Sequence, residues 1–354
     1  METYGQSPSR RSEGTLGERR RQLPWPEGRR FRILSIDGGG IRGILPASIL
    51  AEFERQYLSG TSAGDYFDLI AGTSTGGIIA LGLSIGLPAS EILDLYFDYG
   101  AEIFPAAKPP LASFKRLWAK ARSLAHYQYD RLPLERELRR IFGTRAFDEA
   151  QRRLCIPSFD GFTEVNIFKT PHHPDFRLDW REEMVTVALA TSAAPTYFSI
   201  FRDGQRRFAD GGVWANNPVM VALVDALTCN VLERSQIDIL TLGCGDAEMA
   251  MSDAQVRRGG LWHWREIVSS AMHLSSQNAL GQAGLLIGRD RLIRLNAPPP
   301  CLGVPLPWTT LSARKPSCQV SRRIWRKRTG HWWRRGFFLT RQNLTRPSMR
   351  RTPK

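Results

Sequence analysis

A chain of 354 residues with 42% apolar content can bury a large core, and its 10 Trp and 17 Phe residues argue against global disorder. Its longest apolar runs fall far short of the roughly 20 residues that cross a bilayer, and residues 1–30 lack the apolar core of a signal peptide, so we expect a cytoplasmic protein without a transmembrane segment. The five cysteines are scattered without metal-ligand spacing, which indicates a reducing compartment and no structural zinc, and the net charge of +15 is concentrated at one end of the chain.

The first ninety residues alternate between strand and helix patterns. After a flexible leader over residues 1–30, a short apolar strand is followed by a helix with an apolar stripe, a second short strand and a second helix. This β-α-β-α order predicts parallel strands joined by a right-handed crossover. The predicted strands span residues 31–36 and 67–71, and the predicted helices span residues 43–58 and 75–86.

A third helix begins at Pro88 and leads into a less regular region. Residues 106–125 are basic and amphipathic, and they form either the solvated face of a helix or a lid or membrane-surface helix. Further elements follow, including a strand that ends at Asp210, and together they predict a three-layer α/β sandwich around a mainly parallel sheet over residues 31–297. The remaining predicted helices span residues 132–142, 185–194 and 262–277, and another helix is predicted to start within residues 214–218. The remaining predicted strands span residues 153–159, 164–170, 237–242 and 288–297.

The last part of the chain, residues 298–354, differs in composition from the rest. Residues 301–354 contain 14 Lys and Arg and no acidic residue, which leaves 35 basic and 34 acidic residues over residues 1–300. The tail also contains four Trp residues and has no helical or strand period. It is either a solvated basic tail, a segment that binds anionic lipid or nucleic acid, or the product of a frameshift.

Three glycine-containing motifs stand at the ends of predicted strands. The middle one, Gly72-Thr73-Ser74-Thr75-Gly76, places a serine in a tight turn at a helix N-terminus, where N–H groups favour developing negative charge. Taken alone, such a pentapeptide is about as often an ordinary turn. The other two motifs are Gly38-Gly39-Gly40-Ile41-Arg42-Gly43 and Asp210-Gly211-Gly212.

In this order and without a substitution, the three motifs resemble those of the patatin-like phospholipase family, G-G-G-x-[K/R]-G, G-x-S-x-G and D-G-[A/G]. The resemblance covers residues 31–297 and implies a patatin-like fold. It also implies a metal-independent serine acyl hydrolase, without cofactors, that cleaves fatty-acyl esters of membrane phospholipids. Less specifically, the chain resembles bacterial members of the family that act as cyclic-nucleotide-activated effectors of antiphage defence.

The chemistry of ester cleavage then suggests a role for each motif. A nucleophile, a proton acceptor and donors for the oxyanion are needed, and we expect Ser74, Asp210 and the backbone N–H groups of Gly38, Gly39 and Gly40 to supply them. The remaining positions are expected to shape the turns, except that Asp37 is expected to fix the glycine loop and Arg42 to orient that loop or meet phosphate. These positions are Asp37, Arg42, Gly43, Gly72, Gly76, Gly211 and Gly212.

Two alternative assignments of the same motifs are weaker. An α/β-hydrolase triad would add a histidine after Asp210, and His263 or His273 has the right order. Both lie within an amphipathic helix pattern and not in a glycine-bounded loop, so a Ser–Asp dyad is favoured. A dinucleotide-binding interpretation of residues 38–43 requires an acidic residue at the end of the second strand, where the sequence has Gly72-Thr73-Ser74 instead.

The expected partners follow from the substrate. An unrestrained cytosolic phospholipase would attack its own membrane, so the enzyme must be either harmless by its choice of substrate or gated. The resemblance to nucleotide-activated effectors implies gating by a cyclic dinucleotide, with basic residues within 108–122 as candidate contacts and an open or homo-oligomeric active state. We expect peripheral association with the inner face of the membrane and no specific nucleic acid partner. The alternatives are a constitutive lipid acyl hydrolase and a binding module that acts through the basic tail.

Overall fold

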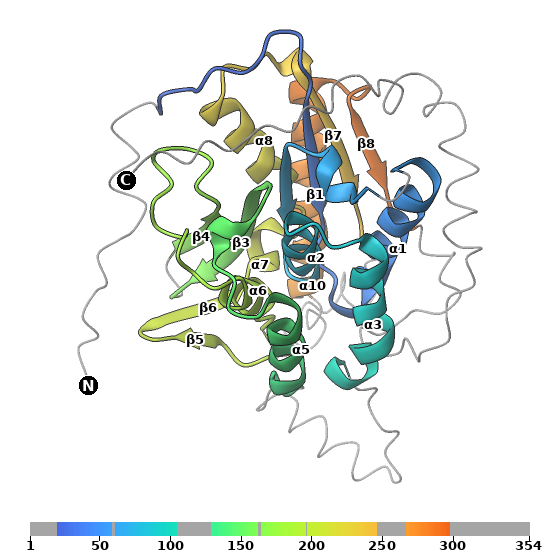
Figure 1. The fold of residues 1–354 in the computed structure, drawn as a ribbon, viewed down its shortest axis with the longest axis vertical. Coiled ribbons are helices and arrows are strands. Elements are labelled where there is room, and N and C mark those ends of the chain that lie inside the picture. Colours follow the sequence, from blue (N-terminus) through green and yellow to red (C-terminus); the bar gives the residue numbers. More distant parts are fainter. Residues whose placement is uncertain are drawn as a thin grey trace, which may run out of the picture.

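The computed structural model describes residues 20–58, 61–104, 129–161, 164–195, 197–245 and 267–297. An eight-stranded sheet in the order β5-β6-β3-β2-β1-β7-β8, with β4 also paired to β3, forms its centre (Figure 1). The strands are β1 (Phe31–Ile36), β2 (Leu69–Gly72), β3 (Arg153–Asp160), β4 (Glu164–Lys169), β5 (Phe201–Asp203), β6 (Arg206–Asp210), β7 (Ile237–Leu242) and β8 (Leu292–Leu295).

Helices cover both faces of this sheet. Alternate side chains of β1 point to opposite faces, as the pleat requires: Leu34 and Ile36 enter one apolar core, and Phe31 and Ile33 enter the other. The first core is closed by α1 (Ile44–Phe53), α2 (Thr75–Ser84), α3 (Ala89–Ile103), α5 (Leu132–Phe142) and α6 (Met184–Thr191). The second is closed by α8 (Val219–Cys229) and α10 (Ile267–Ile287), and the short helix α7 (Gly212–Ala215) precedes α8. The predicted three-layer α/β sandwich is confirmed.

The sheet is mainly parallel, as the order of the elements predicted. Strand β1 pairs in parallel with β2 and β7, and the pairs β2–β3 and β7–β8 are parallel as well. Strands β4, β5 and β6 join in antiparallel orientation. Sequence patterns did not predict this antiparallel part, and it positions the strand that ends at Asp210.

Strands β2 and β6 share one edge of β3 and approach each other end to end. Strand β4 pairs with residues 155–160 of β3 and occupies one edge of that stretch. Strand β2 pairs with residues 153–155 of β3, and β6 pairs with residues 158–160. Because one edge is taken by β4, both β2 and β6 must lie along the other edge. Because β2 runs parallel to β3 and β6 runs antiparallel, their carboxyl ends face each other. Ala71 pairs with Cys155 and Asp210 pairs with Ser158, which leaves two residues of β3 between them.

Several predicted boundaries differ from the observed ones. Helix α10 runs ten residues beyond its predicted end at Gln277, because Ala283 and Ile287 pack into the second core. The predicted helix over 43–58 is divided, and a π-helical turn (Glu54–Leu58) follows α1. In that turn the buried Glu54 carboxylate accepts hydrogen bonds from the N–H groups of Ala63 and Ala89, both at 2.7 Å.

Part of the expected leader is packed against the body. Leu23 forms an isolated parallel bridge with Asn230, and Trp25 packs on the second core, 4.7 Å from Phe31 between ring centroids. The backbone bridge of Leu23 and the packing of the Trp25 side chain attach this segment to the body, which its polar composition did not predict. The predicted basic helix over 106–125, His263 and the tail over 298–354 lie outside the described residues.

Candidate active site

Ser74 occupies a sharp turn between β2 and α2. Its φ of 55° makes it the one residue other than glycine, in the described part of the chain, with a left-handed backbone conformation. Such a conformation costs about 1–3 kcal/mol and persists only where the surroundings enforce it. A Cβ at position 72 would lie 2.1 Å from the Gly76 carbonyl oxygen, and one at position 76 would lie 2.3 Å from the Ile36 carbonyl oxygen. The two motif glycines are therefore required by close backbone packing, as the sequence predicted.

Asp210 lies next to Ser74, and both side chains are buried. Ser74 is 8% exposed and Asp210 is 3% exposed. The Ser74 hydroxyl hydrogen-bonds to the Asp210 carboxylate, and the Gly212 N–H donates to Asp210 Oδ1 at 2.6 Å. Burial raises the pKa of Asp210 to about 6, although both hydrogen bonds oppose that shift. A hydroxyl bonded to a carboxylate of raised proton affinity can lose its proton to that carboxylate during a reaction.

The glycine-rich turn after β1 closes over Ser74. A Cβ at Gly38 would lie 3.3 Å from Ser74 Cβ and 2.6 Å from Asn216 Oδ1, so only glycine brings the loop this close. The Gly38 N–H donates to the Asn216 carbonyl oxygen at 3.0 Å. Because the Gly38 N–H already donates to Asn216, it is not free to bind an oxyanion, and the expected donors are the N–H groups of Gly39 and Gly40.

An ion pair from β8 fixes the base of the same loop. Arg294 donates to both carboxylate oxygens of Asp37, with Nη1–Oδ1 and Nη2–Oδ2 distances of 2.8 and 2.6 Å, and to Thr241 Oγ1 at 2.9 Å. The Asp37 N–H donates to the Leu242 carbonyl oxygen at 2.9 Å. The sequence suggested a positioning role for Asp37, but it gave no signal for Arg294, which stands 257 positions away in an ordinary strand.

We expect Arg294→Ala to lower activity by about tenfold to a hundredfold, because the loop that carries the oxyanion donors loses its anchor, and one donor is typically worth 10²–10³ in rate. Initial rates on a soluble ester would measure this effect. Arg291→Ala is the matched control, because Arg291 precedes the same strand and pairs with Asp238, which lies away from the glycine loop. Equal losses in both variants would mean that Arg294 supports only the sheet.

Arg42 and Gly43 join the glycine loop to its neighbours. Arg42 Nη1 donates to the Gly245 carbonyl oxygen at 3.2 Å, which ties the loop to the segment after β7. A Cβ at Gly43 would lie 2.2 Å from Thr75 Oγ1, so the first and second motifs touch here. Of the two roles considered for Arg42, these contacts support orientation of the loop.

Two buried threonines complete the support of the serine turn. The Ser74 N–H donates to Thr191 Oγ1 at 3.0 Å, and the Thr191 hydroxyl donates to the Pro157 carbonyl oxygen at 2.6 Å. The Thr73 hydroxyl donates to the Ala215 carbonyl oxygen at 2.6 Å. Sequence patterns did not point to Thr191, which is one small residue of a predicted apolar helix.

No histidine of the described residues bonds to Asp210. His273 lies half-buried on α10, and His263 is outside the described part of the chain. His172 is engaged at both ring nitrogens, by Asp225 Oδ1 at 2.9 Å and Thr170 Oγ1 at 2.8 Å. Among the described residues, the geometry therefore favours the dyad over a triad that includes His273.

A buried group of Cys155, His172 and Asp225 has its potential ligand atoms within 4.8 Å of one another, a spacing that suits a metal ion. The Lys169 ammonium already binds Asp225 Oδ2 at 2.7 Å. These partners hold the pKa of Asp225 far below its ordinary value, while burial raises the pKa of the Cys155 thiol and lowers that of His172. A lysine thus supplies the positive charge that a metal would bring.

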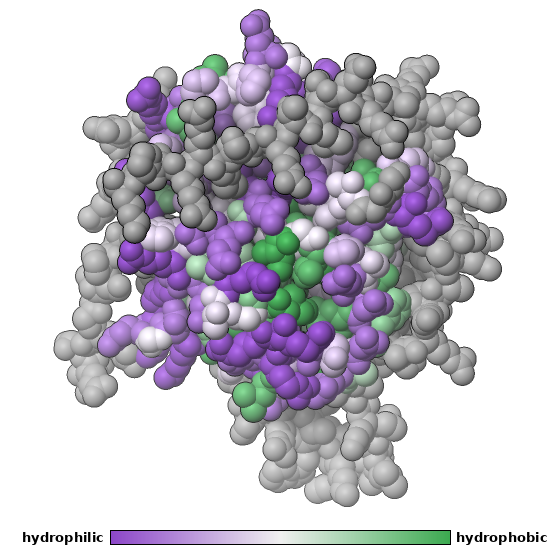
Figure 2. Space-filling view, in the orientation of Figure 1, coloured by the Kyte–Doolittle hydropathy of each residue, from purple (hydrophilic) through white to green (hydrophobic). Residues whose placement is uncertain are grey.

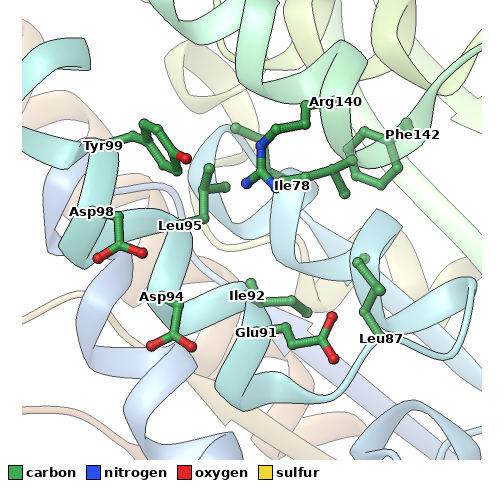
Figure 3. Close-up of a pocket in the computed structure, with 12 residues that line it drawn as sticks. Ile78, Leu87, Glu91, Ile92, Asp94, Leu95, Asp98, Tyr99, Arg140 and Phe142 are labelled. Atoms are coloured by element: carbon green, nitrogen blue, oxygen red, sulfur yellow. The ribbon is translucent and has the colours of Figure 1, made fainter.

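A separate cavity of about 400 Å³ lies among α2, α3 and α5. Figure 2 shows apolar side chains gathered over this region of an otherwise hydrophilic face, and Figure 3 shows Leu95 and Ile78 near the Arg140 guanidinium. Glu91, Asp94 and Asp98 line it together with one cation, Arg140. Its lining includes neither Ser74 nor Asp210, and its net negative charge opposes the binding of phosphate groups.

The chain is clearly similar to known proteins. A family model described as patatin-like phospholipase matches residues 34–223, which is more than half of the chain. The chain therefore belongs to the patatin-like phospholipase family, and it is a hydrolase of the phospholipase class.

Individual relatives extend the match. The chain is 40% identical over 262 residues to a cGAMP-activated phospholipase of Vibrio cholerae serotype O1, across 68% of this chain and 73% of the relative. It is 42% identical over 205 residues to a cGAMP-activated phospholipase of Escherichia coli, across 55% of this chain and 56% of that relative. A solved structure, VipD from Legionella pneumophila, matches with a TM-score of 0.41 and 12% identity over 87% of this chain and 70% of VipD.

Proposed function

We propose that this protein hydrolyses fatty-acyl esters of membrane phospholipids through an acyl intermediate on Ser74. The single observation that carries the proposal is the hydrogen bond between the Ser74 hydroxyl and the buried Asp210 carboxylate, at a helix N-terminus and beside a glycine-rich loop. Together these features supply a nucleophile, a proton acceptor and nearby backbone N–H groups.

The reaction proceeds in two halves. Ser74 Oγ attacks the ester carbonyl while its proton passes to Asp210, and the N–H groups of Gly39 and Gly40 stabilise the oxyanion. The carbon–oxygen bond to the lysophospholipid then breaks, and the leaving oxygen takes the proton from Asp210. Water cleaves the acyl-serine ester in the second half, and Asp210 serves again as proton acceptor.

Incubation of the purified chain with phosphatidylcholine and phosphatidylethanolamine vesicles tests the proposal. We expect equimolar free fatty acid and lysophospholipid by mass spectrometry, and covalent labelling of Ser74 by a fluorophosphonate. A folded protein that releases no fatty acid under any activating condition, or one that is labelled at another serine, would contradict it.

We further propose that a cyclic dinucleotide activates this enzyme, in the setting of antiviral defence. The support is the similarity to two relatives named cGAMP-activated phospholipase. A ligand of this kind acts by binding the active state, whether open or oligomeric, more tightly than the inactive one. The acidic cavity over α2 is a poor candidate for the nucleotide, because its three carboxylates would face the phosphates.

Vesicle hydrolysis titrated with cGAMP and with other cyclic dinucleotides tests this control, and light scattering follows the oligomeric state in parallel. We expect low activity without ligand and at least a tenfold rise with one of them. Full activity without ligand, unchanged across the series, would leave a constitutive lipid acyl hydrolase. Vesicle flotation tests peripheral membrane association. No described helix is long and apolar enough to cross a bilayer.

A further inference from the structure

The side chain of Asn216 lies where the three motifs meet, and the proposed chemistry gives it no role. Asn216 follows α7, six positions after Asp210 in the sequence. Its Oδ1 atom is buried, and in the described structure it has no hydrogen-bond partner. A buried acceptor without a donor costs about 1–3 kcal/mol, so such an atom in an active site points to a donor that arrives with the reaction.

The contacts on its other side set the orientation of the amide. Asn216 Nδ2 donates to Ser276 Oγ at 3.1 Å. The Ser276 hydroxyl donates its own proton to the Met272 carbonyl oxygen at 3.0 Å, so it can only accept from Asn216. The amide nitrogen therefore faces α10, and the oxygen faces the catalytic residues.

Two motif glycines keep the space in front of this oxygen open. A Cβ at Gly38 would lie 2.6 Å from Asn216 Oδ1 and 3.3 Å from Ser74 Cβ. A Cβ at Gly212 would lie 3.2 Å from Asn216 Oδ1 and 3.0 Å from Asp210 Oδ1. The amide oxygen thus borders the same small space as the serine and the carboxylate.

The chemistry of the substrate identifies the missing donor. The ester and phosphodiester groups of a phospholipid are acceptors only, so they cannot satisfy Asn216 Oδ1. The second half of the reaction brings a water molecule to this space, and a buried water needs two to four polar partners. Asn216 Oδ1 and Asp210 are two acceptors for its two protons.

We infer that Asn216 is a positioning residue for the water that cleaves the acyl-Ser74 intermediate. The water directs one O–H to Asn216 Oδ1 and the other to the Asp210 carboxylate, which aims its oxygen lone pair at the acyl carbonyl. As the water oxygen bonds to the carbonyl carbon, Asp210 takes its proton. The bond between that carbon and Ser74 Oγ then breaks, and Ser74 recovers the proton from Asp210. The inference rests on the proposed function.

Pre-steady-state hydrolysis of a p-nitrophenyl ester separates the two halves. In Asn216→Ala we expect a burst of nitrophenol within about threefold of the wild-type rate, followed by steady turnover at least tenfold slower, with acyl-Ser74 accumulating in intact-mass spectra. The matched control is Ser275→Ala, since Ser275 makes a comparable bond from α10 to the Trp214 carbonyl oxygen at 3.0 Å, and it should behave as wild type. A burst slowed as much as turnover, without acyl-enzyme, would overturn the inference.

Asn216→Asp gives a second readout in a variant of nearly the same shape. A carboxylate in this position would disfavour ionisation of Asp210, so the acidic midpoint of activity should move upward from about 6. An unchanged pH profile would mean that the side chain does not face Asp210. If acyl-Ser74 never forms in the wild type, the proposed function itself fails; if it forms and Asn216→Ala hydrolyses it at the wild-type rate, only this inference fails.

Discussion

Ser74→Ala is expected to reduce lipid hydrolysis by at least about a thousandfold, because the nucleophile of a serine hydrolase has no substitute. The fold should be unaffected, since the turn depends on its glycines and alanine meets the same backbone conformation as serine. Fatty-acid release from activated vesicles measures the loss, and circular dichroism checks the fold.

Ser84→Ala is the control for this variant. Ser84 is also buried in α2, where its hydroxyl donates to the Leu81 carbonyl oxygen at 2.7 Å, ten residues from the candidate nucleophile. It should keep near-wild-type activity. If a folded Ser74→Ala protein kept more than a few per cent of the activity, Ser74 would have no place in the mechanism.

Asp210→Asn should be almost as inactive, because an amide cannot accept the serine proton. The substitution preserves shape, so the loss would reflect chemistry and not packing. His273→Ala, measured in the same assay, should keep most activity, because no described histidine bonds to Asp210. An inactive His273→Ala together with an active Asp210→Asn would restore the triad and exclude the dyad.

The wild-type enzyme should lose activity as the pH falls below about 6, because Asp210 must be ionised to accept a proton and burial raises its pKa to about 6. The contribution of Asp210 to the free energy of unfolding should change in the opposite direction and decrease as the pH rises through this range. Between pH 3.8, the ordinary pKa, and about 6, folded Asp210 keeps a proton that the unfolded chain releases, so this residue makes folding less favourable as the pH rises. Thermal unfolding of wild type and Asp210→Asn across this window would show the difference, and a gap that does not grow with pH would contradict it.

The local parts of the site could be predicted from the sequence, because each motif folds as a contiguous turn. The serine turn needs Gly72 and Gly76 as its own neighbours, and the strand and helix patterns around it specify where the turn stands. The parallel pairing of β1 and β2 follows from the helix that separates them.

The supporting residues could not be predicted, because they come from distant parts of the chain through the fold. Arg294, Thr191 and Asn216 stand in stretches that read as an ordinary strand, an apolar helix and a helix start. Their roles depend on tertiary contacts, including the antiparallel addition of β6 to β3, and no local period encodes them. The same holds for Trp25, whose packing partner Phe31 belongs to the sheet.

Because β2 and β6 approach each other end to end along β3, the number of β3 residues between them determines the distance between Ser74 and Asp210. Only Ile156 and Pro157 lie between Cys155, the partner of Ala71, and Ser158, the partner of Asp210. The spacing of the dyad therefore depends on two residues that belong to neither motif. One residue inserted there would lengthen the strand by about 3.3 Å and turn every later side chain to the opposite face. Both motifs would remain intact in such a chain, yet the hydroxyl and the carboxylate would no longer meet. The length of β3 between these two positions is therefore a requirement of the active site, in addition to its catalytic side chains.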